Sequence, residues 1–169
     1  MKEINNAELE KVLRIQEEML LFDRFGNKDA WALGSFLTEK VYANHLALAI
    51  AIRKVNGNIL FQHCTEKTNL NNQNWMHRKF NSVCLMERSS LLTWALAASS
   101  EEPVARHGLS DSEYVFCGGG FPIRLKTGEL VAVVTVSNLP HHLDHSFLVE
   151  ALAEWLQVKD VPSSDCFFE

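Results

Sequence analysis

The stretch HLALAIAIRKVNGNILFQHC, residues 45–64, decides the fold. Its two apolar runs, Leu46–Ile52 and Ile59–Cys64, flank the dipeptide Asn56–Gly57. Asn-Gly is favoured in a two-residue hairpin turn, because both central residues of that turn need a positive φ. The stretch therefore predicts a β-hairpin, whose two strands pair antiparallel.

A second hairpin is predicted closer to the C-terminus. Pro122–Leu125 and Leu130–Ser137 flank a turn at Lys126–Gly128, and a further short strand is expected at Tyr114–Cys117. Helical spacing of apolar residues predicts four helices, at about 5–20, 29–43, 75–98 and from 144 onward. The order α-α-β-β-α-β-β-β-α, with its hairpins, predicts an α+β fold in which helices flank an antiparallel sheet, rather than a doubly wound parallel sheet.

Length and charge limit the classes of protein that this chain can be. Its 169 residues predict one domain over residues 1–169, and a 47% hydrophobic, 22% charged composition is typical of a soluble globular protein. The formal net charge is -5, and the longest basic cluster is the short run His77–Lys79. This balance argues against a nucleic-acid binder that neutralises phosphates.

The sequence also predicts a cytoplasmic protein. The polar start MKEINNAELEK lacks the apolar core of a secretory signal, and no run of about 18 apolar residues could span a membrane. None of the four cysteines belongs to a C-x-x-C pair, which argues against a zinc cluster or a disulfide framework. A reducing compartment is therefore expected.

Three consecutive glycines, Gly118, Gly119 and Gly120, raise the question of a phosphate-binding loop. A Walker loop needs G-x-x-x-x-G-K-[ST] before a helix, and a dinucleotide loop also opens onto a helix. Here Phe121–Pro122 and a predicted strand follow instead. We therefore expect structural glycines, at least one of them at a positive φ, in a bend that other backbone or a ligand approaches closely.

Two clusters of residues are candidates for a ligand site. Trp75, Arg78 and Lys79 are expected to open the third helix, where an aromatic ring and two cations at a helix N-terminus would receive a carboxylate. Asp144 and His145 are expected at the start of the last helix. The alternative for the first cluster is a solvated charged turn, and for the second an Asp144 N-cap followed by polar histidines.

Residue types used in catalysis and metal binding add no further motif. His141 and His145 have the spacing of two ligands on one helix face, but His141 is expected in the turn before the helix. Cys117 is expected to be a small buried hydrophobe rather than a reactive thiol. No Ser-His-Asp or Cys-His order with a nucleophile turn is found, so no catalytic residue is assigned.

The C-terminal part of the chain resembles a known family. GGGFPIRLKTGELVAVVTVSNLPHHLDHSFLVEALAEWL, residues 118–156, resembles the C-terminal half of the GlcG/HbpS-like family, whose domain is labelled haem-degrading. One family glycine is replaced by Ala132. FGNKDAWALGSFLTEKV, NWMHRKFNSVCLMERSS and LPHHLDH resemble one branch of that family, so the likeness extends over about residues 22–157. The positions that match the family's motif are Gly119, Gly120, Pro122, Ser137 and Asp144.

This resemblance implies a profilin-like domain and a closed homo-oligomer. Some relatives bind haem and are connected with its breakdown or with redox sensing, whereas a eukaryotic relative of the branch is linked to protein targeting. We therefore expect an oligomeric domain that binds haem or another anionic small molecule, with a non-catalytic homo-oligomeric interaction protein as the alternative. A haem iron needs one imidazole beside an apolar slot, and five histidines are candidates: His45, His63, His77, His107 and His145.

The two clusters and the glycine bend are expected to meet near the edge of the sheet. There they would form one pocket with an aromatic face, cations and an imidazole, suited to a flat anionic ligand. Assembly is expected because apolar residues occur where one antiparallel sheet cannot cover them, and exposed apolar patches mark contacts. These residues are Val149, Leu156, Phe167 and Phe168.

Overall fold

The computed structural model describes residues 4–100 and 103–168, and it confirms the α+β fold. One antiparallel sheet has the strand order β2-β1-β4-β3. Its strands are β1 (Ala49–Lys54), β2 (Ile59–Cys64), β3 (Gly120–Arg124) and β4 (Leu130–Ser137). The α-helices of the described residues are α1 (Asn6–Met19), α2 (Asn27–Ala43), α3 (Leu70–Met86), α4 (Ser90–Ser100) and α5 (His141–Leu156).

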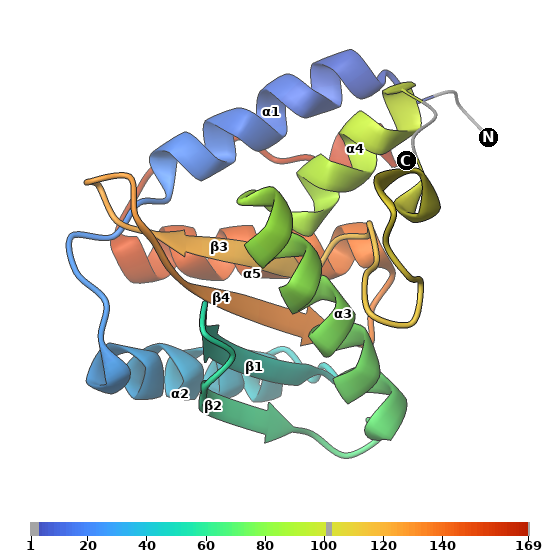
Figure 1. Ribbon diagram of the computed structural model, residues 1–169. Coiled ribbons are helices and arrows are strands. Elements are labelled where there is room, and N and C mark those ends of the chain that lie inside the picture. Colours follow the sequence, from blue (N-terminus) through green and yellow to red (C-terminus); the bar gives the residue numbers. More distant parts are fainter. Residues whose placement is uncertain (1–3, 101–102, 169) are drawn as a thin grey trace.

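Alternation along the strands divides the core between the two faces of the sheet. Ala49 and Ala51 of β1 contact Met76 of α3, so small residues allow that helix to lie close to the sheet. Ile50 and Ile52 point the other way, into the main core with α2 and α5. Figure 1 shows the resulting layers, with α3 on one face, α2 and α5 on the other, and α1 packed on α4 beyond β3.

Both predicted hairpins are present, although the turn at Asn56–Gly57 differs from the predicted two-residue type. Gly57 takes a φ of 90° and its amide donates to the Lys54 carbonyl, while no positive φ occurs at Asn56. Gly128 has the same geometry, with a φ of 96° and an amide that donates to Leu125. Each turn therefore has three residues and ends in one left-handed glycine, so a single positive φ per turn is enough.

The predicted third helix is wrong in its start and in its continuity. It begins at Leu70, because Asn69 and Asn72 form reciprocal capping bonds there. It then ends at Glu87, which takes a left-handed φ of 52°. A new helix, α4, follows because the Ser89 hydroxyl accepts from the Leu92 amide while the Ser89 amide donates to Glu17 of α1. The expected long helix is thus two helices held at their junction by a third.

Three smaller expectations are also corrected. Residues 114–117 form no strand, and the last helix begins at His141, three residues before Asp144. Val149 is 5% exposed, and Leu156, Phe167 and Phe168 pack against core clusters of the same chain. Val149 is therefore covered by the chain itself, and the other three residues, expected to mark an assembly surface, are covered in part.

The two edges of the sheet differ. Beside β3, the backbone of Phe22 donates to the Arg124 carbonyl and accepts from the Lys126 amide, so a short segment covers that edge. Along β2, no further strand pairs within the described residues. None of the helices in the described part of the chain is long and apolar enough to cross a membrane.

Candidate functional site

The three glycines form a bend that leads into β3, and this bend packs against the end of β4 and the start of α5. Gly119 has a φ of 108°, so the expected positive φ is confirmed. A Cβ atom on Gly118 would lie 2.1 Å from the His141 carbonyl oxygen, and one on Gly119 would lie 2.8 Å from the Val136 carbonyl oxygen. No side chain fits at these two positions, because backbone from β4 and α5 occupies the space.

An ion pair lies directly against this bend. Lys79 Nζ is 2.8 Å from Asp144 Oδ2 and also donates to the Val136 carbonyl at 2.9 Å. Asp144 Oδ1 accepts from the Leu139 amide. Burial raises the pKa of Asp144 to about 6, and the Lys79 ammonium acts against that rise. Lys79 is therefore already paired inside the protein rather than offered to a ligand.

A pocket of about 490 Å³ opens beside the ion pair, and we call it the tryptophan pocket. Trp75 of α3 and Trp94 of α4 both line it, together with Cys117, which precedes the glycines. Lys79 and Asp144 also contribute to its lining. Asparagine side chains add hydrogen-bonding groups, from Asn71, Asn72 and Asn138. A volume of this size lies within the range of small-molecule sites.

Arg78 supplies a cation beside this pocket. Its guanidinium carbon lies 4.6 Å from the centre of the Trp75 ring, a stacked cation–π contact. The Nε atom is buried and has no hydrogen-bond partner within the described residues. A guanidinium donates five hydrogens and accepts none, so this Nε–H still lacks an acceptor. Arg78 is not among the residues that line the pocket, and it lies beside the pocket through its contact with Trp75.

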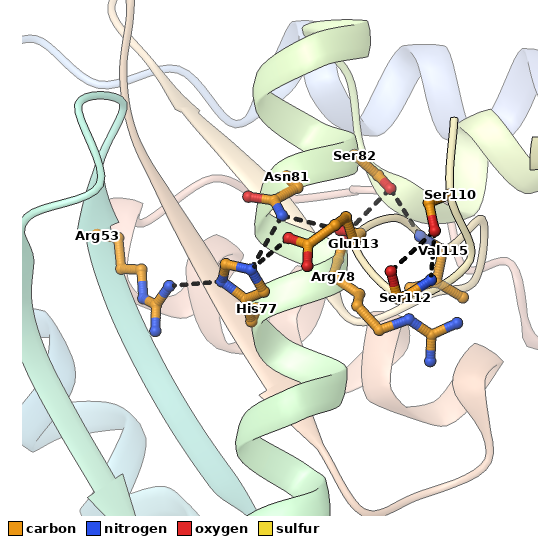
Figure 2. A network of polar contacts seen from close by, with 9 residues as sticks. All are labelled: Arg53, His77, Arg78, Asn81, Ser82, Ser110, Ser112, Glu113 and Val115. Carbon is orange, nitrogen blue, oxygen red and sulfur yellow. Dashed lines mark hydrogen bonds and ion pairs between the residues drawn. The ribbon is translucent and has the colours of Figure 1, made fainter. Parts of the chain in front are cut away.

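Figure 2 shows that the neighbouring His77 has a different role. Arg53 Nη1 lies 3.3 Å from His77 Nδ1, and His77 Nε2 lies 3.2 Å from Glu113 Oε2. Because arginine only donates, Nδ1 accepts and Nε2 carries the proton toward Glu113. Asn81 also donates to the Glu113 carbonyl, and Ser82 accepts from the Val115 amide. These contacts fasten the loop 110–115 onto α3.

Two of the three histidines of α5, His141 and His145, are held neutral by burial. The pKa of His145 falls to about 3, and the pKa of His141 falls to about 4, chiefly through loss of solvent. His145 is fully buried and its Nε2 pairs with Gln16. His141 Nδ1 accepts from the Gly118 amide and the residue lines the tryptophan pocket. No group of three or more metal-binding side chains occurs among the residues described.

The structure thus brings only part of the expected site together. Trp75, Lys79 and Asp144 line one pocket, and Gly118–Gly120 form the bend behind it. Trp75, Arg78 and Lys79 do not open a helix, because α3 begins at Leu70. His145 faces the interior, and the imidazole at the pocket belongs to His141. Sequence reasoning missed Trp94, because an unbroken helix gives no reason to bring it beside Trp75.

The chain is similar in sequence to one protein family and to proteins of two bacteria. A family model described as "Haem degrading protein HbpS-like" matches residues 25–153. A UPF0303 protein of Paraburkholderia phymatum is 40% identical over 142 residues, covering 83% of this chain and 86% of that protein. A UPF0303 protein of Azotobacter vinelandii is 39% identical over 153 residues, covering 90% of this chain and 91% of that protein.

Solved structures share the fold at low sequence identity. The Ybr137w protein superposes with a TM-score of 0.81 at 24% identity, covering 93% of this chain and 98% of that chain. HbpS superposes with a TM-score of 0.63 at 18% identity, covering 79% and 90%. PduOC in its complex with haem superposes with a TM-score of 0.59 at 15% identity, covering 76% and 93%.

Proposed function

The chain belongs to the HbpS-like family of haem-degrading proteins, and from this premise we propose that it binds a flat, anionic small molecule in the tryptophan pocket. Haem is the first ligand to test, because HbpS-like relatives are described as haem-degrading and the related fold of PduOC is solved with haem. We further propose that residues 1–169 act as one domain in the reducing cytoplasm, where its four free cysteines remain reduced.

The observation that carries this proposal is the Arg78 guanidinium stacked on Trp75, whose buried Nε has no hydrogen-bond partner among the described residues. The ring beneath it gives a planar ligand an apolar face, and Trp94 gives a second one. A carboxylate of the ligand would supply the acceptor that Arg78 lacks, through a charge-assisted hydrogen bond. Lys79 would contribute little, because Asp144 already neutralises it.

The side chains in and beside the pocket also suit haem, both its flat ring and its propionate groups. Trp75 and Trp94 would contact the ring, and Arg78 would hold a propionate. For the iron, the pocket offers the Cys117 thiol and the neutral His141 imidazole. His141 would have to give up the bond from Gly118 to move its proton to Nδ1 and free Nε2. A bound iron would supply redox chemistry, while the protein residues bind and orient the ligand.

Titration with hemin and with iron-free protoporphyrin IX tests the proposal. We expect both to quench tryptophan fluorescence, and hemin to shift its Soret band. Arg78→Met should weaken both about tenfold, as loss of one charge-assisted contact implies. Arg24→Met, which removes an exposed arginine elsewhere, should change neither. Absence of quenching by both molecules would overturn the proposed function, and binding of protoporphyrin alone would exclude an iron ligand.

A second candidate function, a homo-oligomeric interaction protein, is favoured by the open edge of the sheet. Ile59 of β2 is 48% exposed, and Trp31 and Tyr42 of α2 are 67% and 48% exposed. Trp31 packs edge-on against Phe61 of β2, so these apolar groups follow the unpaired strand. Such an edge is a template for pairing with another chain. A role among protein partners would use this surface.

Light scattering separates the two candidates. A closed homo-oligomer through β2 should dissociate when Ile59→Lys places a charge at the edge, while porphyrin binding remains unchanged. Leu70→Lys, at an exposed apolar residue of α3, is the matched control. A monomer in the unmodified protein at micromolar concentration would contradict the oligomer.

A further inference from the structure

A second pocket lies between α5 and the chain that follows it, and it shares no lining residue with the tryptophan pocket. We call this hollow of about 360 Å³ the tail pocket. Val149 and Ala153 of α5 line one side, and Val161 of the tail lines another. Together with Val158 and Pro162 these apolar side chains give the pocket a hydrophobic wall, and its other lining residues are polar.

All the charged side chains among the described residues that line this pocket are negative. Glu150 and Asp160 both line the tail pocket and are exposed, and neither has an ion-pair partner in residues 4–100 or 103–168. No lysine, arginine or histidine is among the lining residues that the structure describes. The last turn of α5 also lacks a basic residue, so the negative end of its dipole is uncompensated. The electrostatics of the pocket therefore favour a cation.

An unpaired hydroxyl provides an independent sign of a missing partner. Ser164 lines the tail pocket, is 1% exposed, and its Oγ has no hydrogen-bond partner among the described residues. The neighbouring Ser146 hydroxyl, by contrast, is paired with the His142 carbonyl and with Asp165. A buried hydroxyl without a partner is costly, so Ser164 calls for a group that donates to it or accepts from it.

We propose that the tail pocket binds a small molecule that carries a primary ammonium on an apolar body. The ammonium has three donors, and the three acceptors on offer are the carboxylates of Glu150 and Asp160 and the hydroxyl oxygen of Ser164. The apolar body packs against Val149 and Val161. This site is separate from the tryptophan pocket and does not depend on the function proposed for it.

Benzylamine is the probe, and benzyl alcohol and benzoate are its neutral and anionic counterparts of the same shape. In amide NMR spectra of the full chain, benzylamine should shift the resonances of Val161, Ser163 and Ser164, and the other two molecules should not. The variant Glu150→Gln/Asp160→Asn should weaken benzylamine binding about tenfold, because two partly exposed ion pairs are lost. Ser164→Ala should also weaken it, and Glu129→Gln, in the β3–β4 turn, should leave it unchanged.

Three results would overturn the proposal. Equal binding of benzyl alcohol would show that the ammonium is not recognised. Benzylamine shifts centred on Trp75 and Trp94 would assign the cation to the tryptophan pocket instead. Binding of a lysine-containing peptide without binding of benzylamine would make this surface a protein contact. Because Glu150 and Asp160 are exposed, their amide variants should fold, and a circular dichroism spectrum verifies that they do.

Discussion

Lys79 of α3 and Asp144 of α5 form an ion pair across the glycine bend, with 2.8 Å between Nζ and Oδ2 and at most 3% of either side chain exposed. Lys79→Met would leave the Asp144 carboxylate buried and unpaired. We expect it to lower the free energy of unfolding by about 3–5 kcal/mol. Urea denaturation measures this change.

Two controls accompany the Lys79 variant. The double variant Lys79→Met/Asp144→Leu removes both charges and should recover much of the lost stability. Lys126→Met breaks an exposed pair with Asp23 and should cost less than about 1 kcal/mol. A Lys79→Met protein as stable as Lys126→Met would show that the buried pair does not hold the bend.

The glycine bend should resist even the smallest side chain. In Gly118→Ala the new Cβ meets the His141 carbonyl oxygen at 2.1 Å, so backbone must move. We expect a loss of about 1–3 kcal/mol or more, seen as a lower midpoint in thermal unfolding. Gly26→Ala is the matched control, because its nearest neighbour would be 3.7 Å away and its φ is -130°. Equal midpoints for the two variants would contradict the close approach.

Acid should destabilise the protein through the buried His145 and the half-buried His141. Burial holds the pKa of His141 at about 4 and that of His145 at about 3, below the value of 6.5 expected for an unfolded chain. As the pH falls from 6.5 toward 4, these histidines therefore bind protons in the unfolded chain but not in the folded protein, and the free energy of unfolding decreases. Asp144 offsets part of this, because its raised pKa of about 6 lets the folded protein take up a proton first.

Unfolding free energies measured from pH 7 to pH 4 test this sign. His145→Gln keeps a donor for Gln16 but cannot be protonated, so its stability should fall less steeply with acid than that of the unmodified protein. His45→Gln, which removes an exposed imidazole, should keep the original slope. Parallel curves for the unmodified protein and His145→Gln would refute the assignment of the acid loss to His145.

The contacts in Figure 2 predict that the amides of the loop 110–115 are protected from hydrogen exchange by local contacts with α3. Ser82→Ala removes the acceptor of the Val115 amide, 3.0 Å away, and should speed hydrogen exchange at Val115. Ser35→Ala is the control, because the Ser35 hydroxyl donates to the Trp31 carbonyl of its own helix and not to the loop. If exchange at Val115 is unchanged in Ser82→Ala, the loop is held by its other contacts with α3.

Local patterns in the sequence were enough for the two hairpins, but they predicted a strand at 114–117 that is absent and left the strand order of the sheet open. Alternating apolar residues and turn glycines act over a few residues, so Gly57 and Gly128 mark turns whatever surrounds them. Helix boundaries were predicted less well. The break at Glu87 depends on Glu17, which lies 72 residues from Ser89 in the chain and accepts from its amide. No local pattern in residues 75–98 contains that contact.

The candidate site divides in the same way. The sequence by itself determined that the glycines serve the backbone, and it drew attention to Trp75, Arg78, Lys79 and Asp144. Only the tertiary structure decided that Lys79 forms an ion pair with Asp144, that His145 is buried in the core, and that Trp94 and Trp75 line the same pocket. The reason is physical: propensities and turn chemistry are local, whereas burial and charge pairing depend on which side chains the packing of α3, α4 and α5 brings together.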